Sequence, residues 1–117
     1  MLNDAKDFSK IYLVTGYTDL RGGIDKLAAG LFYKFEINPF EYNAIFLFCG
    51  RKSNKIKALV WEKDGFLLLY KRLDNGAFVW PRDSNEVKNI SKRQFDMLMK
   101  GFSVEGRIKE VLPKTLL

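Results

Sequence analysis

The chain has 117 residues, of which 47% are hydrophobic and 15% aromatic, so it can bury a packed core and is not disordered as a whole. Twenty Lys and Arg outnumber 14 Asp and Glu, the net charge is +6, histidine is absent and Cys49 is the single cysteine. This composition excludes a disulfide framework, a cysteine-based metal site and every catalytic pair that needs a histidine base.

The sequence also bears on where the protein works. No run approaches the roughly 18 to 20 apolar residues of a membrane span, and the polar first ten residues do not resemble a secretory signal. A lone cysteine suits a reducing compartment. We therefore expect a cytoplasmic protein with no membrane association.

The first half of the chain predicts a strand and a helix. Residues 10–15, KIYLVT, are β-branched and aromatic and predict a strand that ends at Gly16. Thr18 and Asp19 are candidate N-caps of the helix that follows, and Asn38-Pro39 is expected to close it. The buried stripe of this helix has helical spacing: Ile24, Leu27, Ala28, Leu31 and Phe35.

The middle of the chain predicts a run of strands. Residues 44–49, AIFLFC, are continuously apolar, as in a central strand that is buried on both faces. Residues 55–62 and 66–73 flank Asp64-Gly65, and residues 77–80 follow Asn75-Gly76. Both dipeptides are strong signals for tight hairpin turns. The pattern indicates an antiparallel meander.

A second helix is predicted from Ser91, because Ser91 and Gln94 form a capping box. Its buried side chains are predicted to be Phe95, Leu98, Met99 and Phe102. Residues Ile108, Val111 and Leu112 are compatible with one more helical turn before Pro113. We therefore predict one α+β domain over residues 1–117, an antiparallel β-meander of about five strands packed with two helices. Its core covers about 10–103, and 104–117 form a C-terminal tail.

Positive charge concentrates in the second part of the chain. Residues 1–41 carry a net charge of −1 and residues 42–117 a net charge of +7, and no acid lies between Glu41 and Glu62. Such asymmetry favours a polyanionic partner such as nucleic acid, although a basic surface can also serve solubility alone.

A two-residue loop at Asp64-Gly65 sets a definite strand register. It places Trp61 opposite Leu68, Leu59 opposite Tyr70 and Lys57 opposite Arg72, with Lys55 beyond. Because side chains alternate between faces, these residues share one basic, aromatic face. The other face is expected to lie under the helices, with Ile56, Ala58, Val60, Leu69, Leu73, Phe78 and Trp80.

Acidic residues give no strong sign of catalysis. Asp64 and Asp74 fall in predicted turns, Asp19 is explained as a helix cap, and Cys49 lies in an apolar strand where a thiol is normally inert. We therefore predict a protein that is not an enzyme, with no catalytic residue, no metal site and no cofactor.

Two segments, IYLVTGYTDLRGGIDKLAA (11–29) and FLFCGRKSNKIKALVWEKDGFLLLYKRLDNGAFVWP (46–81), resemble the accessory proteins encoded by the second open reading frame of the insertion-sequence-sixty-six transposon family. The similarity covers about 10–103. It implies a role in transposition beside a separate transposase and a second small accessory protein, and it carries over no catalytic residue. The matching positions are Thr18, Asp19, Leu20, Arg21 and Gly23 in one motif, and Gly50, Arg51, Lys57, Trp61, Asp64, Gly65, Tyr70, Lys71, Arg72, Trp80 and Pro81 in the other.

The sequence thus predicts a non-catalytic transposition factor that binds DNA through the basic hairpin. The predicted nucleic-acid-binding residues are Arg51, Lys52, Lys55, Lys57, Trp61, Tyr70 and Arg72. The alternative is a module that docks on the transposase or the other accessory protein without touching DNA, since Arg, Tyr and Trp are also enriched in protein interfaces.

Overall fold

A computed structural model of the chain describes residues 1–82 and 84–104. Five strands form one sheet in the order β4-β3-β2-β1-β5, together with two α-helices and two short 3-10 helices. The predicted α+β class is confirmed. The elements are η1 (Leu2–Asp7), β1 (Lys10–Val14), η2 (Leu20–Gly22), α1 (Gly23–Phe35), β2 (Ala44–Cys49), β3 (Lys55–Trp61), β4 (Phe66–Arg72), β5 (Val87–Ile90) and α2 (Lys92–Met99).

The sheet is mixed, so the predicted antiparallel meander was wrong. β1 pairs with β2 in parallel, with Ile11 beside Ile45, while the other neighbouring strands are antiparallel. A parallel pair needs a crossover connection, and α1 supplies it. The sequence pattern predicted a strand at β1 and a helix at α1. It did not show that α1 carries the chain back so that β2 runs parallel to β1.

The fifth strand is β5 and not the predicted 77–80 segment. Residues 77–80 form no strand, because the chain crosses the start of β3, where Phe78 N–H donates to the Ser53 carbonyl at 2.7 Å. Phe78 and Trp80 are nevertheless buried, at 3% and 5% exposure. Their apolar pattern therefore reflects anchoring in the core without strand pairing.

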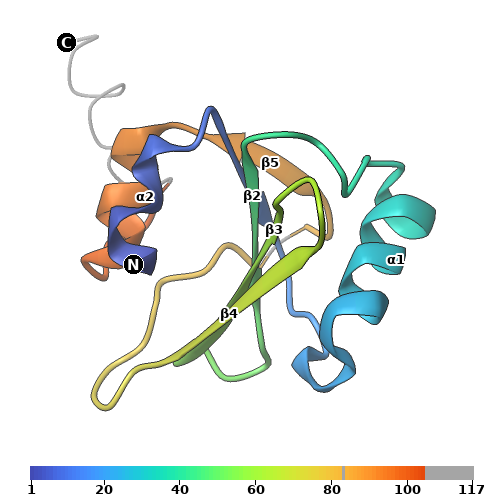
Figure 1. The fold of residues 1–117 in the computed structure, drawn as a ribbon. Helices are drawn as coiled ribbons and strands as arrows, with labels where there is room; N and C mark the ends of the chain where they lie inside the picture. The colour runs from blue at the N-terminus through green and yellow to red at the C-terminus, as the bar shows by residue number, and fades with distance from the viewer. Residues whose placement is uncertain (83, 105–117) are drawn as a thin grey trace, which may run out of the picture.

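Both faces of the sheet are covered (Figure 1). On one face α1 packs Leu27 and Leu31 against Phe46 and Leu59. On the other face η1 and α2 lie together, and Phe95 of α2 joins the cluster that contains Leu2. All six residues of β2 are buried, as predicted for a central strand.

The helix ends follow local rules. Ser91 Oγ accepts the Gln94 N–H at 3.0 Å and Gln94 Oε1 accepts the Ser91 N–H at 2.8 Å, so the capping box is confirmed. Asp19 caps η2, which leads into α1 at Gly23. α1 ends at Phe35 and not at Asn38-Pro39, because Glu36 adopts a left-handed conformation with φ 56°.

The predicted buried stripe of α2 holds for Phe95 and Leu98, while Met99 is partly buried. Phe102 was predicted as buried but is 59% exposed, because the helix stops at Met99. The suggested helical turn with Ile108, Val111 and Leu112 lies outside the described residues. In the described part of the chain no helix is long and apolar enough to cross a membrane.

Candidate nucleic-acid interface

The β3–β4 hairpin has a register that differs from the prediction. Lys55 faces Arg72, Lys57 faces Tyr70 and Trp61 faces Phe66. The turn is formed by Lys63-Asp64 and not by Asp64-Gly65, since Glu62 N–H donates to the Gly65 carbonyl at 2.8 Å and Lys63 has φ 75°. The pairing is shifted by two residues, so every side chain keeps its predicted face but meets a different partner.

The predicted basic face is not one open surface, because α1 lies on its middle. Leu59 is fully buried in the cluster beneath α1, and Leu68 packs against the same cluster. Trp61 lies at the far end of β3 and contacts the rings of Phe40 and Phe66, each with a centroid distance of 4.9 Å. The face is therefore divided into an aromatic end and a basic end.

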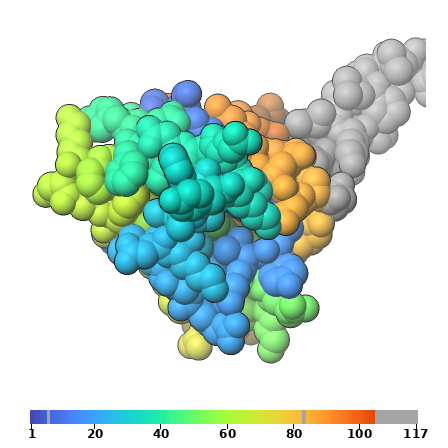
Figure 2. Space-filling view, turned by 90° about the vertical axis from the view of Figure 1, so that its right-hand side faces the viewer, coloured from blue at the N-terminus to red at the C-terminus, as the bar shows by residue number. Residues whose placement is uncertain are grey.

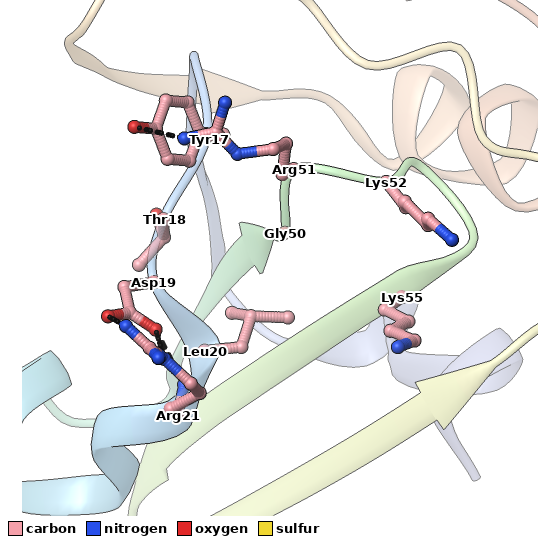
Figure 3. A pocket seen from close by; sticks show the side chains of 9 residues that line it. All are labelled: Tyr17, Thr18, Asp19, Leu20, Arg21, Gly50, Arg51, Lys52 and Lys55. Atoms are coloured by element: carbon pink, nitrogen blue, oxygen red, sulfur yellow. Dashed lines mark hydrogen bonds and ion pairs between the residues drawn. The ribbon is translucent and has the colours of Figure 1, made fainter.

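The basic end opens into a cleft between two loops (Figure 3). One loop follows β1 and the other follows β2, and the carboxyl ends of parallel neighbouring strands lie at the same edge of a sheet. We call this site the two-loop cleft; it has a volume of about 480 Å³. It is lined by Tyr17, Thr18, Asp19, Leu20, Arg21, Gly50, Arg51, Lys52 and Lys55.

The space-filling view shows how the two loops meet at the surface. Residues near 17 to 22 lie below α1, and residues near 50 adjoin them at the lower margin of the same face (Figure 2). The two segments are far apart in the chain, and Thr18 N–H donates to the Cys49 carbonyl at 2.7 Å. The two motifs matched in the sequence are thus joined at this site.

Charge in the two-loop cleft is strongly positive. Among the described residues that line it, Asp19 is the only acid. The Arg21 guanidinium donates two hydrogen bonds of 2.9 Å to this carboxylate. These bonds hold the pKa of Asp19 well below its usual range. Asp19 is therefore ionised and its charge offsets that of Arg21, so Arg51, Lys52 and Lys55 leave the lining with an excess of cations.

Arg51 is pre-oriented by Tyr17. Its Nη2 donates to the Tyr17 hydroxyl at 2.9 Å, and its guanidinium carbon lies 4.5 Å from the centroid of the Tyr17 ring. Both side chains are exposed, and Figure 3 shows them at one rim of the cleft, with Lys52 and Lys55 on the adjoining side. A planar cation stacked in this way suits contact with phosphate oxygens.

Arg82 fastens the two loops together. Its guanidinium donates to the Gly16 carbonyl at 2.7 Å, to the Gly50 carbonyl at 2.8 Å and to Ser53 Oγ at 2.9 Å. Sequence reasoning missed this residue, although it directly follows the matched F-V-W-P motif. Its role depends on the crossing of residues 77–82 past the start of β3.

Replacing Arg82 with alanine should loosen both loops and expose Cys49. This thiol is fully buried, burial raises its pKa, and Arg82 Nη2 lies 3.5 Å from its Sγ. We expect a thiol reagent to modify native Cys49 about tenfold faster in Arg82→Ala, as about 1.4 kcal/mol of local stability is lost. Arg93→Ala, on the exposed surface of α2, is the matched control. Equal rates in both variants would contradict a fastening role.

The structure brings together some of the predicted binding residues. Arg51, Lys52 and Lys55 line the two-loop cleft, and Arg72 lies opposite Lys55 on β4. Lys57 is directed inward, where its Nζ donates to the Leu20 carbonyl.

Two predicted aromatic residues lie outside the cleft. Tyr70 is 56% exposed beside Lys57, whose Nζ lies 5.6 Å from the ring centroid. Trp61 is six residues from Lys55 along β3, or about 20 Å. The aromatic residue that does line the cleft, Tyr17, was not predicted.

Within residues 1–82 and 84–104, no three acidic or cysteine side chains gather into a group that could hold a metal ion.

Comparison with known proteins gives the family. The chain is 35% identical over 92 residues to "Uncharacterized protein y4hO" of Sinorhizobium fredii (strain NBRC 101917 / NGR234), covering 79% of each chain. It is 25% identical over 92 residues to "Uncharacterized protein y4jC" of the same organism, covering 79% of this chain and 78% of the other. No solved structure matches. The family model described as IS66 Orf2 like protein matches residues 9–109, and the chain therefore belongs to this family of insertion-sequence accessory proteins.

Proposed function

We propose that this accessory protein binds the phosphate backbone of DNA through the two-loop cleft during transposition. The observation that carries the proposal is that Arg51, Lys52 and Lys55 all line one cleft, and that the only acid among its described lining residues is already paired. Cations without an acidic partner suit contact with phosphates, because Lys and Arg that bind DNA release its condensed counterions and this release favours binding.

The hairpin extends the cationic surface beyond the cleft. Arg72 is exposed and lies opposite Lys55, so two like charges face each other across the β3–β4 pair. Opposed like charges destabilise a strand pair slightly, and an anion between them removes that cost. The sequence predicted that Lys57 would face Arg72. In the structure Lys55 faces Arg72 instead, and Lys55 lines the cleft.

The proposed site includes only part of the predicted residue set. Arg51, Lys52, Lys55 and Arg72 would contact phosphates, and Tyr17 would hold Arg51 in place. Lys57 adds positive charge near the cleft, but its Nζ already donates a hydrogen bond to the Leu20 carbonyl. None of these side chains is arranged as a bidentate pair for base edges, so we propose backbone contact with little sequence preference.

A salt titration tests the proposal. Fluorescence anisotropy of a labelled duplex from the end of the element gives the slope of log affinity against log salt. Four phosphate contacts predict a slope of about −3.6 for the wild type. The triple variant Arg51→Gln, Lys52→Gln, Lys55→Gln should retain a slope of only about −0.9 and bind far more weakly.

The control variant removes the same charge elsewhere. Lys34, Lys92 and Arg93 are exposed on α1 and α2, and replacing all three with glutamine should leave the slope near its wild-type value. If both triple variants lose affinity equally, binding reflects net charge and the cleft is not the site. If the cleft variant binds DNA normally but no longer captures the transposase, the cleft is a protein-docking surface.

A further inference from the structure

β4 is an edge strand without the usual protection. It lies at the end of the sheet order, and no strand in the described part of the chain pairs with its outer side. It has seven residues, Phe66–Arg72, with no proline or glycine, and its cations are confined to the last two positions. The opposite edge strand, β5, has only four residues. Natural sheets keep edges short or charged, so a long apolar edge signals a pairing partner.

The hairpin hydrogen bonds show which main-chain groups are free on that edge. Leu73 N–H donates to the Asn54 carbonyl and Glu62 N–H donates to the Gly65 carbonyl, both at 2.8 Å. Hydrogen-bonded pairs alternate along an antiparallel ladder, so the odd-numbered residues of β4 bond to β3. The outward N–H and C=O groups therefore belong to the even-numbered residues Phe66, Leu68, Tyr70 and Arg72.

We propose that β4 pairs antiparallel with β4 of a second copy of this chain, which joins the two sheets into one. A two-fold axis through Leu69 pairs all seven residues. It places the outward-bonding Leu68 beside Tyr70 of the second copy, and Phe66 beside Arg72 of the second copy. Such isologous pairing is the commonest form of a closed dimer.

Side-chain chemistry favours a second copy over an unrelated strand. In this register Arg72 lies opposite Phe66 of the second copy, where it can contact the aromatic ring. Lys71 lies opposite Leu67 of the second copy, so no two like charges face each other. The two cationic ends are separated by the length of the strand, about 20 Å. Lys71 is held on the η1 face by Asn3 Oδ1, at 2.6 Å from its Nζ, and does not project across the edge.

The edge is accessible in the fold. In Figure 1, β4 is drawn in front of β3, with α1 on one side and η1 and α2 on the other. These helices lie on the faces of the sheet, and among residues 1–82 and 84–104 no strand pairs with the outer side of β4. Each dimer would carry two two-loop clefts, but the pairing does not depend on DNA binding.

Light scattering coupled to gel filtration tests the pairing on the full chain. We expect the wild type to have twice the monomer mass of 13.6 kDa. Tyr70→Pro removes one outward N–H without touching the bonds to β3, and should weaken association at least tenfold. Tyr70→Thr loses the ring but keeps the N–H, and should remain a dimer. A wild type that stays monomeric, or equal masses for the two variants, would overturn the proposal.

Cross-linking gives an independent readout if Tyr70→Pro fails to fold. Leu69 residues of the two copies would face each other in a non-hydrogen-bonded pair, with Cβ atoms about 4.5 Å apart. Leu69→Cys should therefore form a covalent dimer on mild oxidation. Arg72→Cys is the control, because its two copies would lie about 20 Å apart. Buried Cys49 is common to both variants. No cross-link in Leu69→Cys, or equal cross-linking in both, would refute this register.

Discussion

Replacing Trp80 with alanine is expected to lower the free energy of unfolding by about 5 kcal/mol. The indole is 5% exposed and belongs to the cluster between the sheet and α2, and truncating a buried Trp costs about 3 to 5 kcal/mol. Its Nε1 also donates to the Val14 carbonyl at 2.9 Å, and losing that donor adds about 1 kcal/mol or more. Chemical denaturation followed by circular dichroism measures the change.

Trp80→Phe separates the two contributions. Phenylalanine keeps most of the apolar volume but cannot donate to Val14, so we expect a loss of about 2 kcal/mol. The segment from Phe78 to Arg82 has no strand pairing, so the buried Trp80 side chain helps to hold this segment in place. It thereby positions Arg82 beside the two loops. If Trp80→Ala costs no more than Trp80→Phe, the ring does not fill the core as described.

Replacing Thr15 with valine is expected to cost about 3 kcal/mol, although the two side chains have nearly the same shape. Thr15 is fully buried. Its hydroxyl donates to the Ser84 carbonyl at 2.7 Å and accepts the Glu86 N–H at 2.9 Å. Valine leaves both partly buried main-chain groups without this partner, and each lost hydrogen bond of this kind costs about 1 to 2 kcal/mol.

Thr15→Ser is the matched control. Serine keeps the hydroxyl and loses one buried methyl group, so its cost should be about 1 kcal/mol. Denaturant midpoints of the two variants, at equal m-values, give the comparison. If Thr15→Ser is the more destabilised of the two, packing and not hydrogen bonding holds residues 84–86 against β1.

The faces of the hairpin could be predicted from the sequence, but the pairing could not. Alternation fixes that Lys55 and Arg72 share a face, and this holds for any register shifted by two residues. The turn type fixes the partners, and Lys63 adopts a positive φ that glycine was expected to provide. A local preference for Asp-Gly was thus overridden by the pairing of the whole strand.

The local signals of the chain were sufficient for most of its elements, but not for β5, which takes the place of the predicted 77–80 strand. Helical spacing identified the buried stripe of α1, the capping box fixed the start of α2, and an unbroken apolar run identified β2 as the central strand. Each of these depends on contacts within a few residues or on simple periodicity. The excess of positive charge in the second part of the chain was equally plain from the sequence.

Only the tertiary structure decided which residues of the basic hairpin lie together at the surface. The parallel pairing of β1 with β2 places α1 over the middle of its face and brings Arg21 to Arg51 and Lys55 in one cleft. Trp61 is separated from those cations by the length of β3. Arg82 reaches the site because residues 77–82 cross the start of β3, and no sequence periodicity predicts this path. Sequence alone therefore determined which residues carry charge and which are apolar. Long-range contacts decided which of them meet, because they depend on strand order and crossover and not on neighbours in the chain.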